Sequence, residues 1–283
     1  MSSTNRSLHA ATFPRYTRKT IIFLITALLA ILTIFPLLWM VSSSFKGPTE
    51  VNGTNLIPIA PTLSNFTYVF TQVPFFTYML NSLFVASTVT IGALLLHSMA
   101  AYALALLKFP GRETIFLLIF STFLVSLPII LVPLFILVKA LGMLNSYSGL
   151  IIPSLFNAFG IFLLRQFYLS IPKELSEAAV LDGCNFWQVY WHLVLPLSRP
   201  IMAALAVFFF LANWNNFLWP LTITNDQSLW MIQIGIANFQ TQYAASWNYI
   251  MAASTVAALP TLLLFFVFQR HLVESIKSSG LKG

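Results

Sequence analysis

The sequence predicts an all-α, polytopic membrane protein, and three observations lead to that fold class. Of its 283 residues, 58% are hydrophobic and only 7% carry a charge, with a mean hydropathy of +0.85. Soluble domains carry about 25% charged residues, so this surface cannot face water on every side. Long apolar windows recur along the chain, and its basic residues gather in alternate loops. We therefore expect six transmembrane helices with both termini in the cytoplasm.

The six spans follow from window length, since a helix needs about 20 apolar residues to cross a bilayer. The windows that reach or approach this length are Ile21–Val41, Asn81–Leu107, Thr114–Val138, Ser148–Leu164, Ile201–Ile223 and Tyr249–Phe268. The first is too long for the apolar part of a signal peptide, so we expect an uncleaved anchor. A cytoplasmic tail (1–20) precedes it and an extracytoplasmic loop (42–80) follows. The other five spans form a core (81–268), which ends in a cytoplasmic tail (269–283).

Loop charges predict the orientation. The chain has fourteen Lys and Arg against seven Asp and Glu, a net charge of +7. In a membrane protein such an excess reflects the preference of basic residues for cytoplasmic loops, so we expect no nucleic-acid partner. Only Lys46 and Lys139 fall in the loops on one side, and the other twelve basic residues fall on the opposite side. The side with twelve is predicted to be cytoplasmic.

The spans lack the groups that drive ion-coupled carriers. All seven acids lie outside the windows or at their ends, whereas such carriers bury carboxylates in the membrane. His97 is the one mid-span group that titrates near neutrality, and we interpret it as a packing donor between helices. Cys184 is the only cysteine, so an internal disulfide is excluded, and the histidines show no metal-ligand spacing. Energy for transport must therefore enter elsewhere.

Two features within the spans suggest a polar path or moving helices. Pro128 and Pro133 lie inside the third window, where each removes a backbone hydrogen bond and favours a kink. The fifth window carries the segment NWNNFLWP near its outer end. Its indoles and amides fit an interfacial aromatic belt, and they also fit a surface that binds sugar rings and hydroxyls. The candidate substrate-path residues in this segment are Asn213, Trp214, Asn216 and Trp219.

The longest cytoplasmic loop contains a polar segment, 170–196, that predicts two short helices. Ser170 is a candidate cap for the first helix, Pro172 suits its first turn, and Gly183 suits a left-handed stop. Asn185 is a candidate cap for the second helix, which we expect Pro196 to end. In the first helix, small and apolar residues share one face while acids lie on the neighbouring face. That surface is typical of docking into a partner's groove.

The same segment resembles the EAA loop of ABC-importer permeases. The matching pattern is Glu177-Ala178-Ala179, three residues, Gly183, nine residues, then Leu193, one residue and Leu195-Pro196. Leu193 departs conservatively from the usual isoleucine. The stretches EAAVLDG and LPLSRP are similar to the carbohydrate-importing branch, and the resemblance covers roughly residues 20–283.

This resemblance implies a type I importer permease fold in a bacterial or archaeal inner membrane. It implies a second homologous permease, two copies of an ABC ATPase subunit and an extracytoplasmic solute-binding protein as partners, besides membrane lipid. The ATPase-coupling residues carried over are Glu177, Ala178, Ala179, Asp182, Gly183, Leu193 and Pro196. Gly280, Lys282 and Gly283 match the family's regulatory C-terminal tail. No GxxxxGK[ST] phosphate-binding motif is present, so ATP and Mg²⁺ belong to the partner and this chain carries no cofactor.

Two alternatives remain open at this point. One is an ABC permease for a non-sugar solute, such as a glycerol phosphate ester or a polyol, because such importers share this branch. The other is a membrane enzyme acting on lipid-linked sugar. That enzyme would need convergent carboxylates or a metal site, whereas the acids here cluster in the candidate docking loop.

The charge distribution yields a direct test of topology. We predict that Ser228→Cys, in a Cys184→Ser background, reacts with a membrane-impermeant maleimide in intact cells, since the loop 224–248 is expected outside. The measurement is labelling before and after cell lysis. Labelling that appears only after lysis would contradict the orientation.

Overall fold

The computed structural model describes residues 15–242 and 246–280, and the regular structure in these ranges is helical. The helices of the first half are α1 (Arg15–Ser44), α2 (Ser64–Thr71), α3 (Phe75–Leu106), α4 (Arg112–Ser121), η1 (Thr122–Leu124), α5 (Leu127–Ala140), α6 (Tyr147–Ser154) and α7 (Ala158–Leu169). Those of the second half are α8 (Lys173–Leu181), α9 (Phe186–Val189), the π-helical turn η2 (Tyr190–Val194), α10 (Leu195–Leu197), α11 (Arg199–Trp214), α12 (Leu218–Ile223), η3 (Gln227–Leu229), α13 (Ile232–Gln242) and α14 (Trp247–Gly280).

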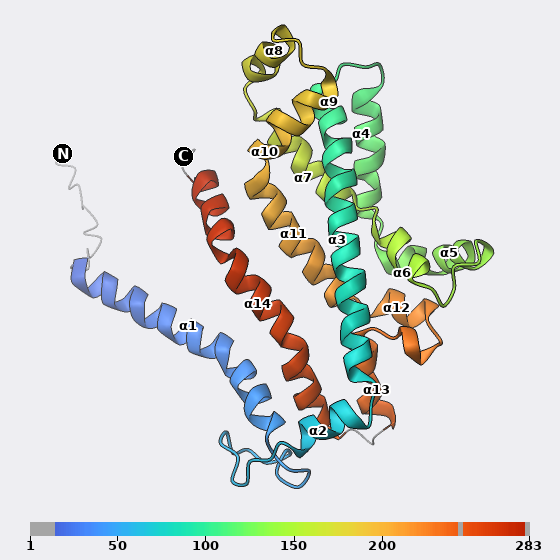
Figure 1. Ribbon diagram of the computed structural model, residues 1–283. Coiled ribbons are helices and arrows are strands. Elements are labelled where there is room, and N and C mark those ends of the chain that lie inside the picture. The colour runs from blue at the N-terminus through green and yellow to red at the C-terminus, as the bar shows by residue number, and fades with distance from the viewer. Residues whose placement is uncertain (1–14, 243–245, 281–283) are drawn as a thin grey trace, which may run out of the picture.

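Helix α3 is the centre of the bundle, because it contributes to all three buried clusters (Figure 1). At one end Tyr78 packs with residues of α11, α13 and α14. In the middle Val85 and Val89 pack with α5, α6 and α12. At the other end Ala101 and Tyr102 pack with α7, η2 and α11. Helix α8 lies beyond this last end, whereas α2 lies at the opposite end (Figure 1).

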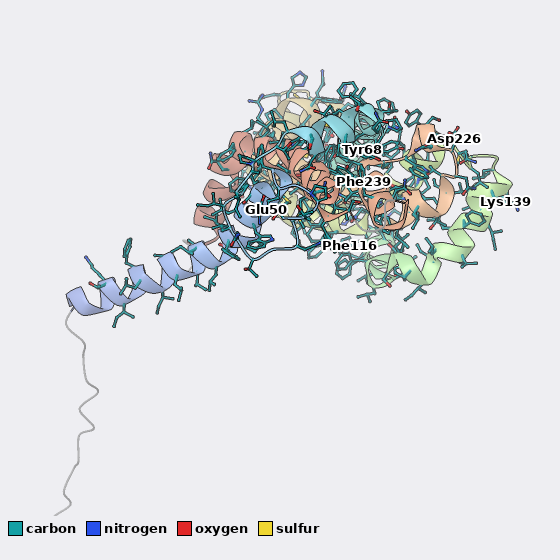
Figure 2. The ribbon with its side chains drawn as sticks, turned by 90° about the horizontal axis from the view of Figure 1, so that it is seen from below. Glu50, Tyr68, Phe116, Lys139, Asp226 and Phe239 are labelled. Atoms are coloured by element: carbon teal, nitrogen blue, oxygen red, sulfur yellow. The ribbon has the colours of Figure 1, made fainter. Side chains whose placement is uncertain are left out.

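Three of the six predicted spans are continuous helices, namely α1, α3 and α14. Three further spans are possible if each bent helix pair is one crossing, which gives three to six candidate spans among the described residues. The bends measure 104° between the α4–η1 segment and α5, 41° between α6 and α7, and 76° between the α9–α10 segment and α11. Figure 2 shows α1 leaving the bundle on one side and Lys139, near the end of α5, on the other.

The predicted third span, Thr114–Val138, is divided between the α4–η1 segment and α5. The chain becomes extended at Val125 and Ser126, and α5 restarts with Pro128 in its first turn. Proline lacks the amide proton that a continuing helix would need, whereas the first turn of a helix leaves that proton unbonded. Pro133, by contrast, stays inside α5. The predicted interruption is therefore present, and it lies ahead of Pro128.

The fourth and fifth predicted spans, Ser148–Leu164 and Ile201–Ile223, also contain breaks. The fourth breaks between α6 and α7, where the Asn157 side chain accepts a 2.9 Å hydrogen bond from the Phe159 amide and starts α7. The fifth breaks at 215–217, between α11 and α12. Hydropathy does not detect these breaks, because the residues on both sides remain apolar.

His97 fills the break in the fourth span. Its ring is 2% exposed, and its Nε2 lies 2.9 Å from the carbonyl oxygen of Leu155 and 3.2 Å from the amide nitrogen of Asn157. With the proton on Nε2 the ring donates to the carbonyl, and with the proton on Nδ1 it accepts from the amide. The interpretation of His97 as a packing group between helices therefore agrees with the structure.

A polar cluster joins α1 to the rest of the molecule at the α2 end. Lys46 is fully buried, and its ammonium donates to the carbonyl oxygen of Asn55 at 2.5 Å and lies 4.3 Å from the centre of the Trp39 ring. The Asn65 amide donates to the Lys46 carbonyl at 2.8 Å, and Asn248 donates to the Asn65 side chain at 2.7 Å. These bonds tie the end of α1, the start of α2 and the start of α14 together.

Gly160 yields a stability prediction. A Cβ atom there would lie 2.5 Å from both His97 Nδ1 and Phe209 Cζ, so Gly160→Ala should force buried rings apart. Overpacking of this kind costs about 1–3 kcal/mol, and we expect a lower thermal unfolding temperature of the detergent-solubilised protein. Gly47→Ala is the matched control, because its Cβ meets nothing within 4 Å. Equal unfolding temperatures for both variants would contradict the close packing at Gly160.

Candidate functional site

Helix α8 lies at the end of the molecule opposite α2 (Figure 1). None of its residues is buried, and the Leu181 side chain is 87% exposed. Glu174 and Glu177 are also exposed, beside the exposed Leu175. The helix starts after Pro172, without a side-chain cap. The expectation that Ser170 caps it is wrong, because α7 runs to Leu169 and the Ser170 hydroxyl donates back to the Phe167 carbonyl at 2.7 Å.

The turn after α8 has the geometry that the sequence predicts. Gly183 has φ +88°, in the left-handed region that favours glycine. Its amide donates to Val180, and the amide of Cys184 donates to Ala179, both at 3.0 Å. These two bonds form a Schellman motif, which satisfies carbonyls at the helix end. A Cβ on Gly183 would meet nothing within 4 Å, so the requirement for glycine within this chain comes from its backbone angle.

The second helix starts as expected and continues further than expected. Asn185 accepts from the Gln188 amide at 3.0 Å, and the Gln188 side chain accepts from the Asn185 amide at 2.8 Å, which completes a capping box. The expectation that Pro196 ends this helix is wrong. A π-helical turn leads into α10, which includes Pro196 and ends at Leu197. The wider π turn precedes Pro196, where an α-helical turn would place the ring against a carbonyl four residues earlier.

The predicted ATPase-coupling residues divide into exposed and partly buried groups. Glu177, Ala178, Asp182, Gly183 and Pro196 are exposed. Ala179 and Leu193 pack against the buried cluster at the end of α3 that lies near α8. The structure therefore gathers these residues at one end of the molecule, and their role in coupling stays a prediction.

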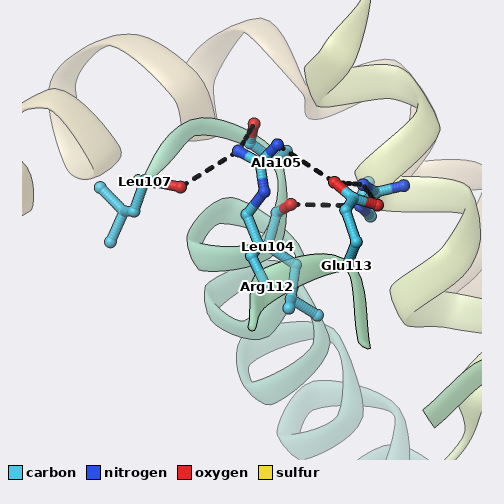
Figure 3. Close-up of polar contacts among 6 residues, drawn as sticks. Leu104, Ala105, Leu107, Arg112 and Glu113 are labelled. Atoms are coloured by element: carbon cyan, nitrogen blue, oxygen red, sulfur yellow. Dashed lines mark hydrogen bonds and ion pairs between the residues drawn. The ribbon is translucent and has the colours of Figure 1, made fainter. Parts of the chain in front are cut away.

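An ion cluster that the sequence did not predict joins α3, α4 and α7 near this end of the molecule (Figure 3). Arg165 in α7 is 6% exposed, and its guanidinium donates to both carboxylate oxygens of Glu113 at 2.8 and 2.7 Å. It also donates to the Leu104 carbonyl at 3.1 Å and lies 3.9 Å from the centre of the Phe116 ring. Hydrogen bonds with a charged partner are roughly twice as strong as neutral ones, so this residue holds α3, α4 and α7 together.

Arg112 completes the cluster from the start of α4 (Figure 3). It donates to the carbonyls of Ala105 and Leu107 at 3.3 and 3.1 Å and to Glu113 at 3.1 Å. Glu113 thus accepts from two arginines, although its own side chain is 60% exposed. The one signal in the sequence was an acid next to a basic residue at the start of a span.

The four candidate substrate-path residues lie around the α11–α12 break. Trp214 and Trp219 are buried, and their indole N–H groups donate to the carbonyls of Ala257 and Gly149 at 3.1 and 3.0 Å. Their rings therefore pack inside this chain. Asn213 and Asn216 are partly exposed.

A further amide pair at this break was missed. Asn215 is exposed, and its side-chain oxygen accepts from Gln233 of α13 at 3.2 Å. Broken backbone at membrane depth is tolerated where it is buried in protein or lines a water-filled cavity. The exposed amides at this break fit the second situation.

Two other site predictions can be located. Gly280 is the last residue of α14, while Lys282 and Gly283 lie outside the described residues. Within the described ranges, no group of three or more His, Cys, Asp or Glu residues could hold a metal ion.

Comparison with known proteins identifies relatives over most of the chain. Residues 93–278 match the family described as "Binding-protein-dependent transport system inner membrane component". The chain is 36% identical over 262 residues to the arabinooligosaccharides transport system permease protein AraQ of Halalkalibacterium halodurans, covering 91% of this chain and 94% of that protein. It is also 36% identical over 208 residues to the sn-glycerol-3-phosphate transport system permease protein UgpE of Yersinia pestis, covering 73% and 74%.

A solved structure shares the fold. It belongs to a bacterial ABC transporter involved in the import of the acidic polysaccharide alginate. The TM-score is 0.82 at 22% sequence identity, and the match covers 91% of this chain and 98% of that one.

Proposed function

This chain belongs to the family of binding-protein-dependent transport system inner membrane components, and from that premise we propose that it is the permease subunit of an ATP-driven importer for a sugar or a sugar-like solute. The resemblance found in the sequence is thereby confirmed at the level of the family. Its relatives are permease proteins of transport systems, so the chain is a transport subunit and the alternative of a membrane enzyme is wrong.

The observation that carries the coupling proposal is the contrast within the loop 170–196. Helix α8 has no buried residue and presents acids and apolar side chains to the exterior, whereas the following segment is packed into the bundle. Large exposed apolar residues beside charges mark a protein interaction surface. In this proposal α8 docks in a groove of an ABC ATPase, and Glu177 forms a charge-assisted contact there.

The proposed assembly contains this chain, a second homologous permease, two copies of the ATPase and an extracytoplasmic solute-binding protein. ATP and Mg²⁺ bind to the ATPase, and this chain supplies no cofactor. The end that carries α8 faces the cytoplasm with both termini, as the loop charges favour. The C-terminal residues, including Gly280, Lys282 and Gly283, are assigned a regulatory contact with the ATPase on the family resemblance alone.

The proposed solute is a sugar, and a glycerol phosphate ester is the second candidate. The sugar proposal is supported by the relative named for arabinooligosaccharides, and the alternative by the relative named for sn-glycerol-3-phosphate. The exposed amides at the α11–α12 break, at Asn213, Asn215 and Asn216, suit hydroxyl groups because they donate and accept hydrogen bonds. Trp214 and Trp219 would contact a solute only after the helices around them move.

The solute class can be tested with the reconstituted importer. We expect proteoliposomes that hold the complete complex and its binding protein to take up a radiolabelled arabino-oligosaccharide or lactose when ATP is enclosed. The same vesicles should take up little sn-glycerol-3-phosphate, because neutral amides form weaker hydrogen bonds to a phosphate dianion than charged donors do. Uptake of the phosphate ester alone would overturn the sugar proposal and leave the permease proposal standing.

The coupling surface can be tested at Glu177. We predict that Glu177→Lys sharply lowers both ATP-driven uptake and co-purification of the ATPase, because losing one partner of a desolvated charge pair costs about 2–5 kcal/mol. Glu174→Lys makes the same charge change one turn earlier and should have a smaller effect. The measurements are uptake, membrane level and the ATPase recovered with the permease. Normal values for Glu177→Lys would show that α8 does not couple through this residue.

Gly183 supplies an independent test of the same loop. Gly183→Asp places a side chain at φ +88° and should disturb the end of α8, so uptake should fall while membrane insertion is kept. Gly111→Asp is the matched control, because Gly111 has φ +79° and equally open surroundings but lies before α4. Equal loss of uptake in both variants would point to general backbone strain. A loss confined to Gly183→Asp would point to the loop 170–196, which we call the coupling loop.

A further inference from the structure

The coupling loop has a second half whose role the docking proposal leaves open. Helix α8 is exposed, while Val189, Tyr190, Val194 and Ser198 in the segment after it are buried. Movement imposed on α8 has two routes along the chain to the spans, back through residues 170–172 to α7 and forward through α9, η2 and α10. On the forward route, the contacts of the buried segment with α3 decide how the movement is transmitted.

Two phenol hydroxyls connect this segment to α3. The hydroxyl of Tyr190 lies 2.5 Å from the Ser98 hydroxyl, and both residues are fully buried. One turn further along α3, the Tyr102 hydroxyl donates to the Phe186 carbonyl at 2.9 Å. The rings of Tyr102 and Tyr190 lie 5.3 Å apart. Tyr102 of α3 thus bonds to α9, and Tyr190 of η2 bonds to α3.

The Ser98 hydroxyl has two neighbours, the Tyr190 hydroxyl and the Leu95 carbonyl at 3.0 Å. When the single Ser98 proton is donated to Leu95, Tyr190 donates to Ser98, and either hydroxyl can be the donor in the bond between them. The chain of bonds runs from the π-helical turn through Ser98 to the backbone of α3.

This arrangement is more than apolar packing. Apolar side chains can slide past one another at little cost, whereas a buried hydroxyl that loses its partner is penalised. Two such bonds, one turn apart on α3, fix the segment along the helix. Tyr190 is also the first residue of the π-helical turn, and such turns often occur at functional sites.

We propose that Ser98, Tyr102 and Tyr190 form a joint through which movement of the coupling loop is transmitted to α3. This inference rests on the proposed function and adds three positioning residues to it. The joint acts on the helix that contributes to all three buried clusters, so a displacement at one end of α3 reaches the packing at the other. None of the three residues contacts the solute or ATP in this proposal.

The test uses the complete importer in proteoliposomes with its binding protein and a sugar that the wild-type complex transports. The variants are Tyr190→Phe, Ser98→Ala, their combination, and Tyr102→Phe. The readout is the amount of sugar imported per ATP hydrolysed, with ATPase co-purification and thermal unfolding as checks on assembly and folding. We expect Tyr190→Phe to lower that ratio roughly 3- to 10-fold, the size expected from one buried hydrogen bond, with the ATPase still bound.

The double variant separates a shared bond from two separate effects. If Tyr190 and Ser98 act through one hydrogen bond, the combined variant should lose no more than Tyr190→Phe alone. A loss equal to the product of the two single losses would overturn the shared bond. Tyr102→Phe provides an independent measure through the Phe186 carbonyl, should the Tyr190 variants fold poorly.

Tyr147→Phe is the matched control. It removes a phenol hydroxyl that donates to Asn81 at 2.7 Å, in the part of α3 far from α8. It should leave the ratio of sugar to ATP unchanged. If Tyr190→Phe and Tyr102→Phe both match this control, the joint is wrong. If the wild-type chain recovers no ATPase at all, the proposed function fails instead.

Discussion

A backbone amide or carbonyl at membrane depth must find a partner within the protein, and much of this structure follows from that constraint. A break in a span releases such groups, so each break needs a neighbour that can bond to them. His97 lies at the break between α6 and α7, next to the Leu155 carbonyl and the Asn157 amide. Trp214 and Trp219 flank the break between α11 and α12, and their indoles donate to carbonyls of α14 and α6 rather than to the backbone of the break itself. Bulky side chains with one polar atom suit this position, because they fill space and bond at once.

The same constraint explains why α3 can be the central helix. It is unbroken over its whole length, so it offers a continuous apolar surface with polar side chains at chosen levels. Asn81 bonds to Trp230 just before α13, His97 bonds at the break between α6 and α7, and Ser98 and Tyr102 both bond to the α9–η2 segment. At the end of α3 near α8, the Arg165 guanidinium donates to the Leu104 carbonyl and to the Glu113 carboxylate, which links α3 to α4. An unbroken helix that contacts broken ones at several levels connects the two ends of the bundle.

The sequence predicted those features, such as helix ends and caps, that depend on a few adjacent residues. Gly183 indicated a left-handed stop and Asn185 indicated a cap, and both are present because each is decided within one turn of helix. Membrane class and the family were predicted from composition and from the spacing between Glu177 and Pro196. The break at Val125 lies close to its expected cause, Pro128, yet hydropathy placed a continuous span across it.

Other features depend on residues distant in the sequence and were therefore missed. Arg165 was counted as a loop charge, but its partner Glu113 is 52 residues away and the pair is visible only after folding. Trp214 and Trp219 are residue types that suit a sugar-binding surface. In the structure their indoles are buried and bond to carbonyls of α14 and α6, which are distant in the sequence. A side chain's type sets which contacts it can make, whereas tertiary packing decides whether its face is available.

The buried cluster around Lys46 has a consequence for the order of events during synthesis. Helix α1 is apolar on every side, so it can enter the membrane as soon as it emerges, without waiting for any other part of the chain. The cluster that connects α1 to the bundle is complete only when Asn248 pairs with Asn65. Asn248 is synthesised 183 residues after Asn65. For most of translation the first helix is therefore inserted but not yet attached. The last span to be made is the one that locks the first in place.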